Sequence, residues 1–307
     1  MKTCAVIYNP NSGHILNKSK MKDYKRLIET HGYTVTLIAT EYHGHAKEIV
    51  SHIGYYDLVM SMGGDGTFNE VVFGNLCRKE PLLLAHIPVG TTNDVGVMFG
   101  YGKNIKNNIE LCLTGTVKQI DIPVVNDRPF VYVAGFGKFM HIPYETSRKE
   151  KKKFGYLAYI YNGIKDFFTN SKYYHLHINH DGEEFETDAS LMLICSSTRI
   201  AGQNNFVKDV KLDDDQFEVL ICSKKKRLEI IGSIGLCAIS PHPEKIDGIT
   251  IFKASDLTIK FDEYQSKAWC IDGEKLEIRT KSYHIKNKSN IKLLIPSINV
   301  DKLFLKK

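Results

Sequence analysis

Ser61-Met62-Gly63-Gly64-Asp65-Gly66-Thr67-Phe68-Asn69-Glu70 forms a glycine-rich turn between two regular segments. The apolar run 58–60 before it predicts a buried strand, and apolar residues at helical spacing behind it predict a helix. Glycines let the backbone take positive φ and come close to a ligand. The first amides of the following helix point outward and attract anions. This order of strand, turn and helix therefore predicts an anion site in an α/β domain.

A second turn of the same kind follows at Pro88-Val89-Gly90-Thr91-Thr92-Asn93-Asp94. Taken alone, either segment is explained by a tight turn in an α/β domain, and Asp94 by helix capping. Asp65 is the unusual residue, because an acid repels a bare phosphate. It makes sense where a divalent cation lies between its carboxylate and the phosphates. The pair of turns therefore favours a nucleotide site that uses Mg²⁺.

The spacing of apolar runs predicts two domains. In residues 1–122 strands alternate with helices, which indicates a doubly wound parallel sheet. Ligands of such sheets bind at the carboxyl ends of the strands, where both glycine turns lie. In residues 123–295 strand-like runs dominate and predict a mostly antiparallel β-sandwich. These runs are 130–135, 174–179, 190–195, 217–222, 248–252, 257–261 and 269–271, with helical patterns at 156–168 and 228–236.

The two turns, together with Tyr8-Asn9-Pro10-Asn11-Ser12-Gly13 at the end of the first predicted strand, resemble the diacylglycerol kinase catalytic domain family. That family includes the soluble bacterial diacylglycerol kinases, related lipid kinases, and sphingosine and ceramide kinases. All three motifs occur in family order, and the resemblance runs the full chain. It implies an α/β ATP-binding domain, a β-rich lipid-substrate domain, and a tail, 296–307, that returns to the first domain.

The resemblance also implies which residues hold ATP. They come from the three loops and from the end of the second predicted strand: Asn9, Pro10, Asn11, Ser12, Gly13, Thr40, Gly63, Gly64, Asp65, Gly66, Thr67, Asn69, Glu70, Gly90, Thr91, Thr92, Asn93 and Asp94. Asp65 has a second implied role, which is to organise the catalytic Mg²⁺.

The family carries a late Asp-Gly-Glu motif whose Glu is the proton acceptor of the reaction. Ile271-Asp272-Gly273-Glu274 matches it, so the resemblance makes Glu274 the catalytic base. Asp181-Gly182-Glu183 has the same three residues, and spacing alone does not choose between them. Asp-Gly between two strand-like runs is a strong hairpin signal, however, which predicts that Glu183 lies at a solvent-facing tip.

An acidic cluster, Asp209 with 213–215, precedes the strand-like run at 217. It is not an EF-hand, because the sixth place lacks glycine and the twelfth lacks Glu. A polar turn explains it without a metal. The resemblance implies a structural Mg²⁺ held by Asp209, Asp214 and the carbonyl of Gln216. Asp215 stands where the family has glycine, which adds charge to the turn.

Bulk properties describe a globular chain of 307 residues with a net charge of +6. No nucleic-acid motif accompanies this mild basicity, so no nucleic-acid partner is expected. There is no apolar run of about 18 residues, the N-terminal apolar run is too short for a signal peptide, and the scattered cysteines favour a reducing compartment. These features predict a cytoplasmic protein and leave open whether it is a monomer or a homodimer.

Two basic runs, 148–153 and 224–227, are most simply solvated loops. The first adjoins Phe154, Tyr156 and Tyr159, and basic residues beside aromatic ones suit the surface of an anionic membrane. We expect the first run to bring the chain to a bilayer as a peripheral protein, where a lipid substrate would be reached.

The residues and the resemblance together predict an ATP-dependent lipid kinase that phosphorylates the hydroxyl of diacylglycerol or a similar lipid. An NAD kinase is an alternative, since that family shares the Gly-Gly-Asp-Gly-Thr turn. The second turn and Asp272-Gly273-Glu274 favour the lipid kinase. A non-catalytic nucleotide or lipid sensor is another alternative, against which stand the retained Asp65 and Glu274.

Overall fold

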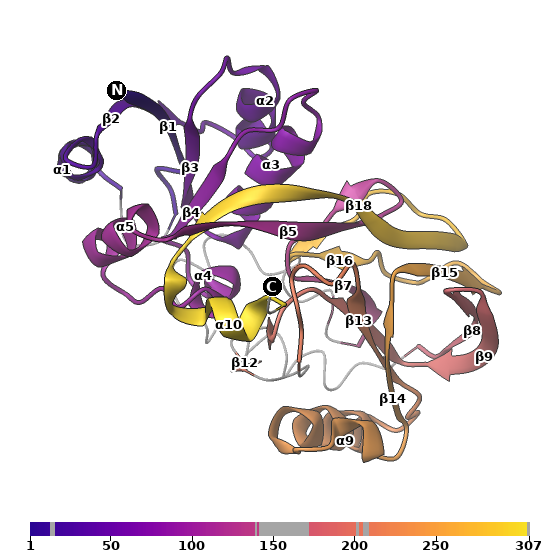
Figure 1. Cartoon of the computed structure of the whole chain (residues 1–307). Helices are drawn as coiled ribbons and strands as arrows, with labels where there is room; N and C mark the ends of the chain where they lie inside the picture. Colours follow the sequence, from indigo (N-terminus) through magenta and orange to yellow (C-terminus); the bar gives the residue numbers. More distant parts are fainter. Residues whose placement is uncertain (13–15, 139, 141–171, 201–202, 205–208, 306–307) are drawn as a thin grey trace. The chain divides into compact units, whose positions relative to one another are not determined.

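The computed structural model describes residues 1–12, 16–138, 140, 172–200, 203–204 and 209–305. The helix expected at 156–168 lies outside them. The chain forms two compact units (Figure 1). The first holds Met1–Ile122 and Ser289–Lys307, and the second holds Pro123–Lys288.

The first unit is built on a parallel sheet in the order β2 (Tyr33–Ala39), β1 (Lys2–Tyr8), β3 (Leu58–Gly63) and β4 (Leu84–Pro88). The last part of β18 (Ser282–Ile295) runs parallel to β4. Strands β3 and β4 are buried along their whole length, as expected for parallel strands covered on both faces.

Helices cover both faces of this sheet. α1 (Lys18–Glu29) packs with α5 (Ile105–Leu113), and α2 (His45–His52) packs with α3 (Asp65–Leu76). Figure 1 shows the two pairs on opposite sides of the strands. Helix α4 (Asp94–Met98) follows β4, and the short segments η2 (Ser297–Asn299) and α10 (Val300–Leu303) follow β18. The doubly wound parallel arrangement predicted from the sequence is confirmed.

Strand β5 (Thr116–Val125) leads into the second unit, which contains a six-stranded antiparallel sheet. The order of that sheet is β14 (Ile249–Ala254), β13 (Phe217–Cys222), β10 (Leu191–Cys195), β7 (Val133–Gly137), β16 (Cys270–Ile271) and β17 (Glu274–Lys275). A second antiparallel group joins the first part of β18 to β15 (Asp256–Phe261), β8 (Tyr174–His180) and β9 (Glu183–Ala189). The remaining described elements are β6 (Arg128–Pro129), β11 (Arg199–Ile200), β12 (Gln203–Asn204), α9 (Arg227–Ile239) and η1 (Pro243–Lys245).

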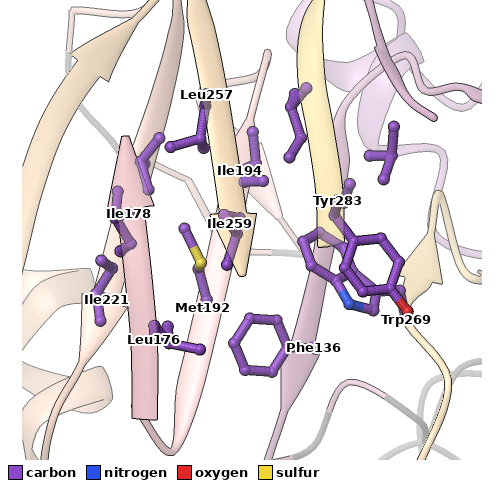
Figure 2. Close-up of a cluster of buried hydrophobic side chains, with 14 of the residues drawn as sticks. Phe136, Leu176, Ile178, Met192, Ile194, Ile221, Leu257, Ile259, Trp269 and Tyr283 are labelled. Carbon is purple, nitrogen blue, oxygen red and sulfur yellow. The ribbon is translucent and has the colours of Figure 1, made fainter. Parts of the chain in front are cut away.

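One apolar core lies between the two antiparallel groups (Figure 2). Phe136 and Trp269 come from the side of the six-stranded sheet, and Phe261 and Tyr283 come from the other. The rings of Trp269 and Tyr283 stack with centroids 4.5 Å apart, and the rings of Phe136 and Phe261 meet edge to face at 4.8 Å. Burial of rings of this size dominates the stability of a core. The predicted antiparallel sandwich is thereby confirmed.

Candidate active site

The loops singled out in the sequence meet at one edge of the parallel sheet. Tyr8 is in register with both Ala39 and Met62, and Gly63 is in register with Pro88. The first four strands therefore end at the same level. Their loops bring together Asn9 to Ser12, Thr40 and the two glycine turns, whereas Gly13 lies outside the described residues. This is the edge at which doubly wound sheets bind ligands.

The two glycine turns touch each other. The Val89 amide donates to the Gly63 carbonyl at 2.8 Å. A Cβ placed on Gly90 would lie 2.6 Å from the Cα of Gly64, and a Cβ on Gly63 would lie 2.5 Å from the side chain of Thr67. A side chain at position 90 would therefore force the two turns apart, and one at position 63 would distort the first turn itself.

Asn93 fixes the shape of the second turn. It adopts the left-handed conformation, with φ of 52°. Its Oδ1 accepts from the Gly90 amide at 2.7 Å, and its Nδ2 donates to the Gly90 carbonyl at 3.0 Å. Asn tolerates this conformation better than most residues. Thr91 is exposed and Thr92 half-buried in the same turn, so both are open to a ligand there.

Asp65 connects the two turns. Its carboxylate accepts from the amides of Asp94 at 3.0 Å and Val95 at 3.2 Å, so it caps helix α4 from the neighbouring loop. Asp94 itself is buried at the start of that helix. A carboxylate has about four lone-pair sites, so the two amides do not by themselves saturate that of Asp65.

Helix α3 offers its first amides to an anion. Its N-cap is Gly64, which has no side chain and makes no capping bond. The helix runs through Leu76, long enough to add its dipole to the attraction for a negative ligand. Gly66 is half-buried at this end, whereas Thr67 and Asn69 are buried and support the turn from within the unit.

Glu70 holds a different loop. Its two carboxylate oxygens accept from the amides of Gly44 at 2.8 Å and Ala46 at 3.1 Å, and His43 Nδ1 lies 3.1 Å away. Gly44 has φ of 88° and provides no side-chain cap for helix α2. The buried carboxylate of Glu70 supplies that cap instead, which positions the loop that follows Thr40.

The first loop is ordered by Asn9. Its amide donates to the Met62 carbonyl at 3.1 Å, and its Oδ1 accepts from the Asn11 amide at 2.9 Å. The Ser12 amide donates to the Asn9 carbonyl at 3.1 Å. Thr40, which is buried, donates its amide to the Tyr8 carbonyl at 2.8 Å. Both loops are thus tied to the ends of the strands that they follow.

A buried polar pair beneath the first glycine turn was not anticipated from the sequence. Ser61 Oγ lies 2.7 Å from His86 Nδ1, and the ring of Phe68 stacks on the imidazole with centroids 4.6 Å apart. Burial lowers the pKa of His86 to about 3, so the imidazole is neutral at physiological pH. Its only sequence signal was a histidine within the apolar run 82–87.

In the second unit, Asp272 and Gly273 form the two-residue turn between β16 and β17, with φ of 48° and 82°. The buried Asp272 carboxylate accepts from three consecutive amides, those of residues 131–133, at 2.6–3.1 Å. Asp272 therefore fixes the segment 131–133, which leads into β7. It fixes the position of the adjacent Glu274.

Glu274 is paired with Arg128. Arg128 Nη2 donates to Glu274 Oε2 at 3.0 Å, and both side chains are 23% exposed. The pair fixes the direction of the carboxylate while leaving part of it accessible. Arg128 belongs to no motif quoted from the sequence, and it lies 146 residues before Glu274, so pattern reasoning had no means of finding it.

Glu183 has a different setting on a similar turn. Asp181 and Gly182 have φ of 50° and 91°, and Asp181 accepts from the amides of Ser255 and Asp256. The side chain of Glu183, however, is 84% exposed at the tip of the β8–β9 hairpin. The same Asp-Gly-Glu sequence thus gives a solvent-exposed carboxylate at Glu183 and a carboxylate paired with Arg128 at Glu274.

A lysine side chain, that of Lys253, lies among the groups of the acidic cluster. Lys253 Nζ lies 3.1 Å from Asp214 Oδ2, 3.3 Å from Glu218 Oε1 and 3.4 Å from the Asp209 carbonyl. Burial raises the pKa of Glu218 to about 7 despite this lysine. Asp215 has φ of 58°, the conformation for which glycine is best suited. The Mg²⁺ ligands Asp209, Asp214 and Gln216 stay a prediction, and an ion there would compete with Lys253.

The basic run 148–153 and its aromatic neighbours lie outside the described residues. In the run 224–227, Lys224 pairs with Asp247, Lys225 lies 3.9 Å from Asp188, and Lys226 lies 3.5 Å from Glu229. Over the part of the chain that the structure describes, no helix is both long and apolar enough to cross a membrane.

Comparison with known proteins gives consistent results for sequence and fold. Residues 3–125 match the model of the diacylglycerol kinase catalytic domain. The chain is 32% identical over 277 residues to a diacylglycerol kinase found in Staphylococcus aureus strains JH9 and Newman, and the match covers 87% of each chain. A crystal structure of a diacylglycerol kinase from Bacillus anthracis str. Sterne aligns with a TM-score of 0.74 at 20% identity, over 96% of this chain and 97% of that one.

A second structure from the same organism aligns with a TM-score of 0.79 at 22% identity, over 96% of this chain and 95% of that one. At these identities the two structures bear on the fold, whereas the longer sequence match bears on the family. The chain belongs to the diacylglycerol kinase catalytic domain family.

Proposed function

We propose that this protein is an ATP-dependent lipid kinase that transfers the γ-phosphate of ATP to the hydroxyl of diacylglycerol or a closely related lipid. The observation that carries the proposal is the contact of the two glycine turns beside the N-terminus of α3, whose N-cap residue makes no side-chain capping bond. Backbone amides presented in this way suit the phosphates of a nucleotide.

The residues of the first unit divide into two groups in this proposal. Thr91, Thr92 and the first amides of α3 contact the phosphates, because they are exposed or half-buried at the strand ends. Asn9, Glu70 and Asn93 act indirectly, because their side chains hold the loops in place. Phosphoryl transfer depends mainly on such positioning and on electrostatic stabilisation.

Asp65 is the residue that would organise Mg²⁺, which neutralises charge on the phosphates when bound. Its carboxylate is held by the amides of Asp94 and Val95, so its direction is set before any cation arrives. A preorganised acid of this kind loses little conformational freedom on binding.

Glu274 is the proposed general base. It would accept the proton of the lipid hydroxyl as that oxygen forms its bond to the γ-phosphorus, while the bond from the γ-phosphorus to the β–γ bridging oxygen breaks and ADP leaves. Arg128 orients the carboxylate through the bond at 3.0 Å. This assignment rests on the family motif and on the contrast with the exposed Glu183.

The lipid class is proposed from the relatives, which are diacylglycerol kinases by name. A lipid acceptor also requires contact with a bilayer, so we propose that the protein acts as a peripheral membrane enzyme on the cytoplasmic side. The basic run 148–153 is the candidate for that contact, with a strength of about 1 kcal/mol per charge at an anionic surface.

A kinase assay with γ-labelled ATP tests the proposal. The purified chain is offered diacylglycerol, monoacylglycerol, sphingosine and ceramide in mixed micelles, with NAD as a soluble acceptor. We expect labelled phosphatidic acid to be the main product. Label found only on NAD would replace the proposal with an NAD kinase. Nucleotide binding without transfer to any acceptor would favour a sensor.

A further inference from the structure

Two histidines stand on the outer face of the sandwich, on the side of β8 away from the core. The burial of β8 alternates, with Tyr174, Leu176 and Ile178 turned into the core. His175 and His177 therefore share the opposite face, as residues two apart on a strand do. Across the β8–β9 hairpin, Asp188 is in register with His175 and Glu186 is in register with His177.

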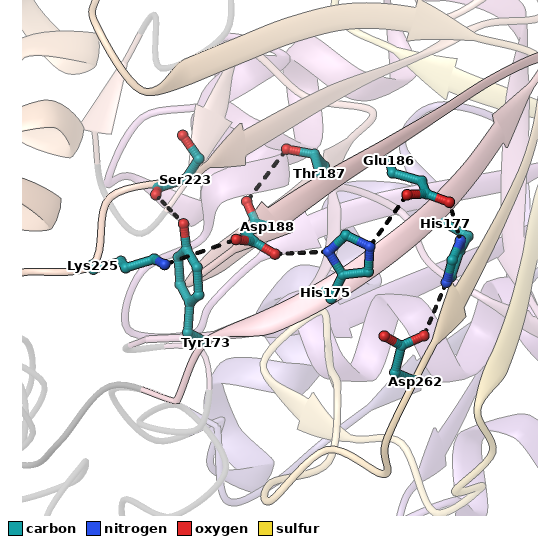
Figure 3. Close-up of polar contacts among 9 residues, drawn as sticks. All are labelled: Tyr173, His175, His177, Glu186, Thr187, Asp188, Ser223, Lys225 and Asp262. Carbon is teal, nitrogen blue, oxygen red and sulfur yellow. Dashed lines mark hydrogen bonds and ion pairs between the residues drawn. The ribbon is translucent and has the colours of Figure 1, made fainter.

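Glu186 lies between the two imidazoles (Figure 3). One of its oxygens is 3.5 Å from His175 Nε2, and the other is 2.9 Å from His177 Nδ1. One ligand atom from each of the three side chains can be chosen so that all lie within 4.8 Å of one another. Their exposed fractions are 40%, 44% and 61%, so the group is open to solvent and its side chains can adjust.

The far nitrogen of each imidazole has its own carboxylate. His175 Nδ1 lies 2.8 Å from Asp188 Oδ1, and His177 Nε2 lies 2.9 Å from Asp262 Oδ1. A carboxylate in this position takes the N–H of the ring and leaves the lone pair on the other nitrogen. Both remaining lone pairs then face the carboxylate of Glu186, an arrangement that is repulsive unless a proton or a cation lies between them.

This is the pattern in which proteins hold transition metals. A histidine ligand usually donates its second N–H to a carboxylate, which orients the ring and strengthens the ligand. Two imidazoles and a carboxylate are ligands that Zn²⁺ accepts, at about 2.0–2.2 Å each. Ligand atoms around one such ion are roughly 3.3 Å apart. Since the chosen atoms lie within 4.8 Å of one another, the side chains need to close by at most about 1.5 Å.

The surrounding charges suit a cation. Glu186, Asp188 and Asp262 place three carboxylates on this face. Basic groups nearby include Lys225, which is 3.9 Å from Asp188, Lys260, which is paired across the strands with His177, and Lys281, whose Nζ donates to the Asp262 carbonyl.

We propose that His175, His177 and Glu186 bind a divalent transition metal, with Zn²⁺ as the best match, and that Asp188 and Asp262 orient the two imidazoles. The remaining coordination position faces solvent and takes water. Because the ligands are nitrogen as well as oxygen, the site selects transition metals over Mg²⁺ and Ca²⁺, which prefer oxygen ligands alone.

The test is calorimetric titration of the metal-free full chain with Zn²⁺ in excess Mg²⁺. We expect saturable binding at one site in the parent and its loss in His177→Gln. Asp188→Asn should weaken affinity roughly 10–100-fold, as removal of a carboxylate behind a ligating histidine does. His284→Gln is the matched control, because His284 also pairs with a carboxylate, Asp256, at 2.9 Å.

Co²⁺ supplies a second readout, since its visible absorption should report nitrogen and oxygen ligands in the parent and in His284→Gln but not in His177→Gln. Thermal melting in the presence of chelator establishes that each variant is folded. Absence of saturable Zn²⁺ binding in the parent, or the same affinity in parent and His177→Gln, overturns the proposal. Equal affinities of parent and Asp188→Asn overturn the orienting role.

Discussion

At the scale of single residues, Glu274 and Glu183 give the sharpest comparison, since both follow an Asp-Gly turn. We predict that Glu274→Gln loses about 10²–10⁴-fold in kcat, the usual contribution of a general base, while still binding ATP. Glu183→Gln should change kcat by less than a few-fold, because the side chain is 84% exposed. Steady-state kinetics with separately measured ATP affinity would decide. A dead Glu183→Gln beside an active Glu274→Gln would reverse the assignment.

Asp65 has a structural role, which is to cap helix α4, and a proposed catalytic role, which is to organise Mg²⁺. In Asp65→Asn one carboxylate oxygen becomes an amide NH₂, which opposes the N–H of Asp94 or Val95. We therefore predict abolished turnover together with a loss of about 0.5–2 kcal/mol, as for a removed helix cap. Calorimetry and a Mg²⁺ titration of the rate measure the two effects. Unchanged turnover with normal Mg²⁺ dependence would contradict the catalytic role.

His86 makes the stability of the first unit depend on acid. Its pKa is about 3 in the folded chain against an ordinary 6.5, so between these values the unfolded chain binds a proton that the folded chain does not. The stability that the neutral His86 contributes is therefore fully present above pH 6.5. It is lost as the pH falls toward 3, with a slope of up to about 1.4 kcal/mol per pH unit.

The predicted consequence is that His86→Gln melts lower than the parent at neutral pH, and that the difference shrinks as the solution is acidified from pH 6.5 to pH 4.5. Melting curves over that range measure it. His31→Gln, at an exposed position of the same unit, is the control. A difference between parent and His86→Gln that stays constant with pH would show that the imidazole does not drive the acid sensitivity.

At the scale of elements, the sequence predicted those turns and strands that are determined by a local pattern of residues. The glycine turns, the strands before them and the Asp181-Gly182 hairpin were all predicted, because turn residues and apolar spacing are local signals. Strand β18 was missed although Tyr283 and Ile285 alternate inward, as do Ile291 and Leu293. The polar stretch 287–290 interrupts that alternation, so the sequence pattern does not predict a single strand here.

The turn that carries the acidic cluster shows why the rest of the site was not predictable. Asp214 and Lys253 are 39 residues apart and meet only because β13 and β14 pair. Arg128 and Glu274 are likewise far apart in the sequence and meet only in the folded chain, as do Asp65 and the Asp94 amide. Contacts of this kind are set by strand register and loop packing, for which a single sequence has no local signal.

Lys253 and Mg²⁺ would compete for the oxygens of this turn. We predict that Lys253→Met melts lower than the parent without metal, because Asp214 and the buried Glu218 lose their cation, and that it gains more than the parent from added Mg²⁺. Asp214→Ala should melt lower and lose the Mg²⁺ response. Melting curves without nucleotide measure this. An equal Mg²⁺ response in the parent and Asp214→Ala would argue against a metal in this turn.

At the scale of the whole molecule, the two architectures were predictable because each follows from a repeated pattern. Strands alternating with helices gave a parallel sheet, and successive short strands gave an antiparallel sandwich. The sequence pattern changes near Pro123, and the second compact unit begins at that residue. How a lipid reaches the enzyme is a property of the whole surface and depends on charge rather than on fold.

The two basic runs allow that dependence to be measured within one chain. We predict that replacing Lys151, Lys152 and Lys153 with Gln weakens sedimentation with anionic vesicles by roughly 100-fold at low salt, from about 1 kcal/mol per charge. The matched control replaces Lys224, Lys225 and Lys226, which have acidic neighbours in the second unit, and should bind almost as the parent does.

The difference between the two triple variants should fade at high salt, where exposed charges are screened. Because both variants lose the same net charge, equal weakening in the two would mean that overall charge, and not the run 148–153, draws the protein to the membrane. Equal binding by both variants and the parent at low salt would mean that neither run docks. Loss confined to the first variant, with kinase activity retained on a lipid dispersed in neutral micelles, would separate membrane docking from catalysis.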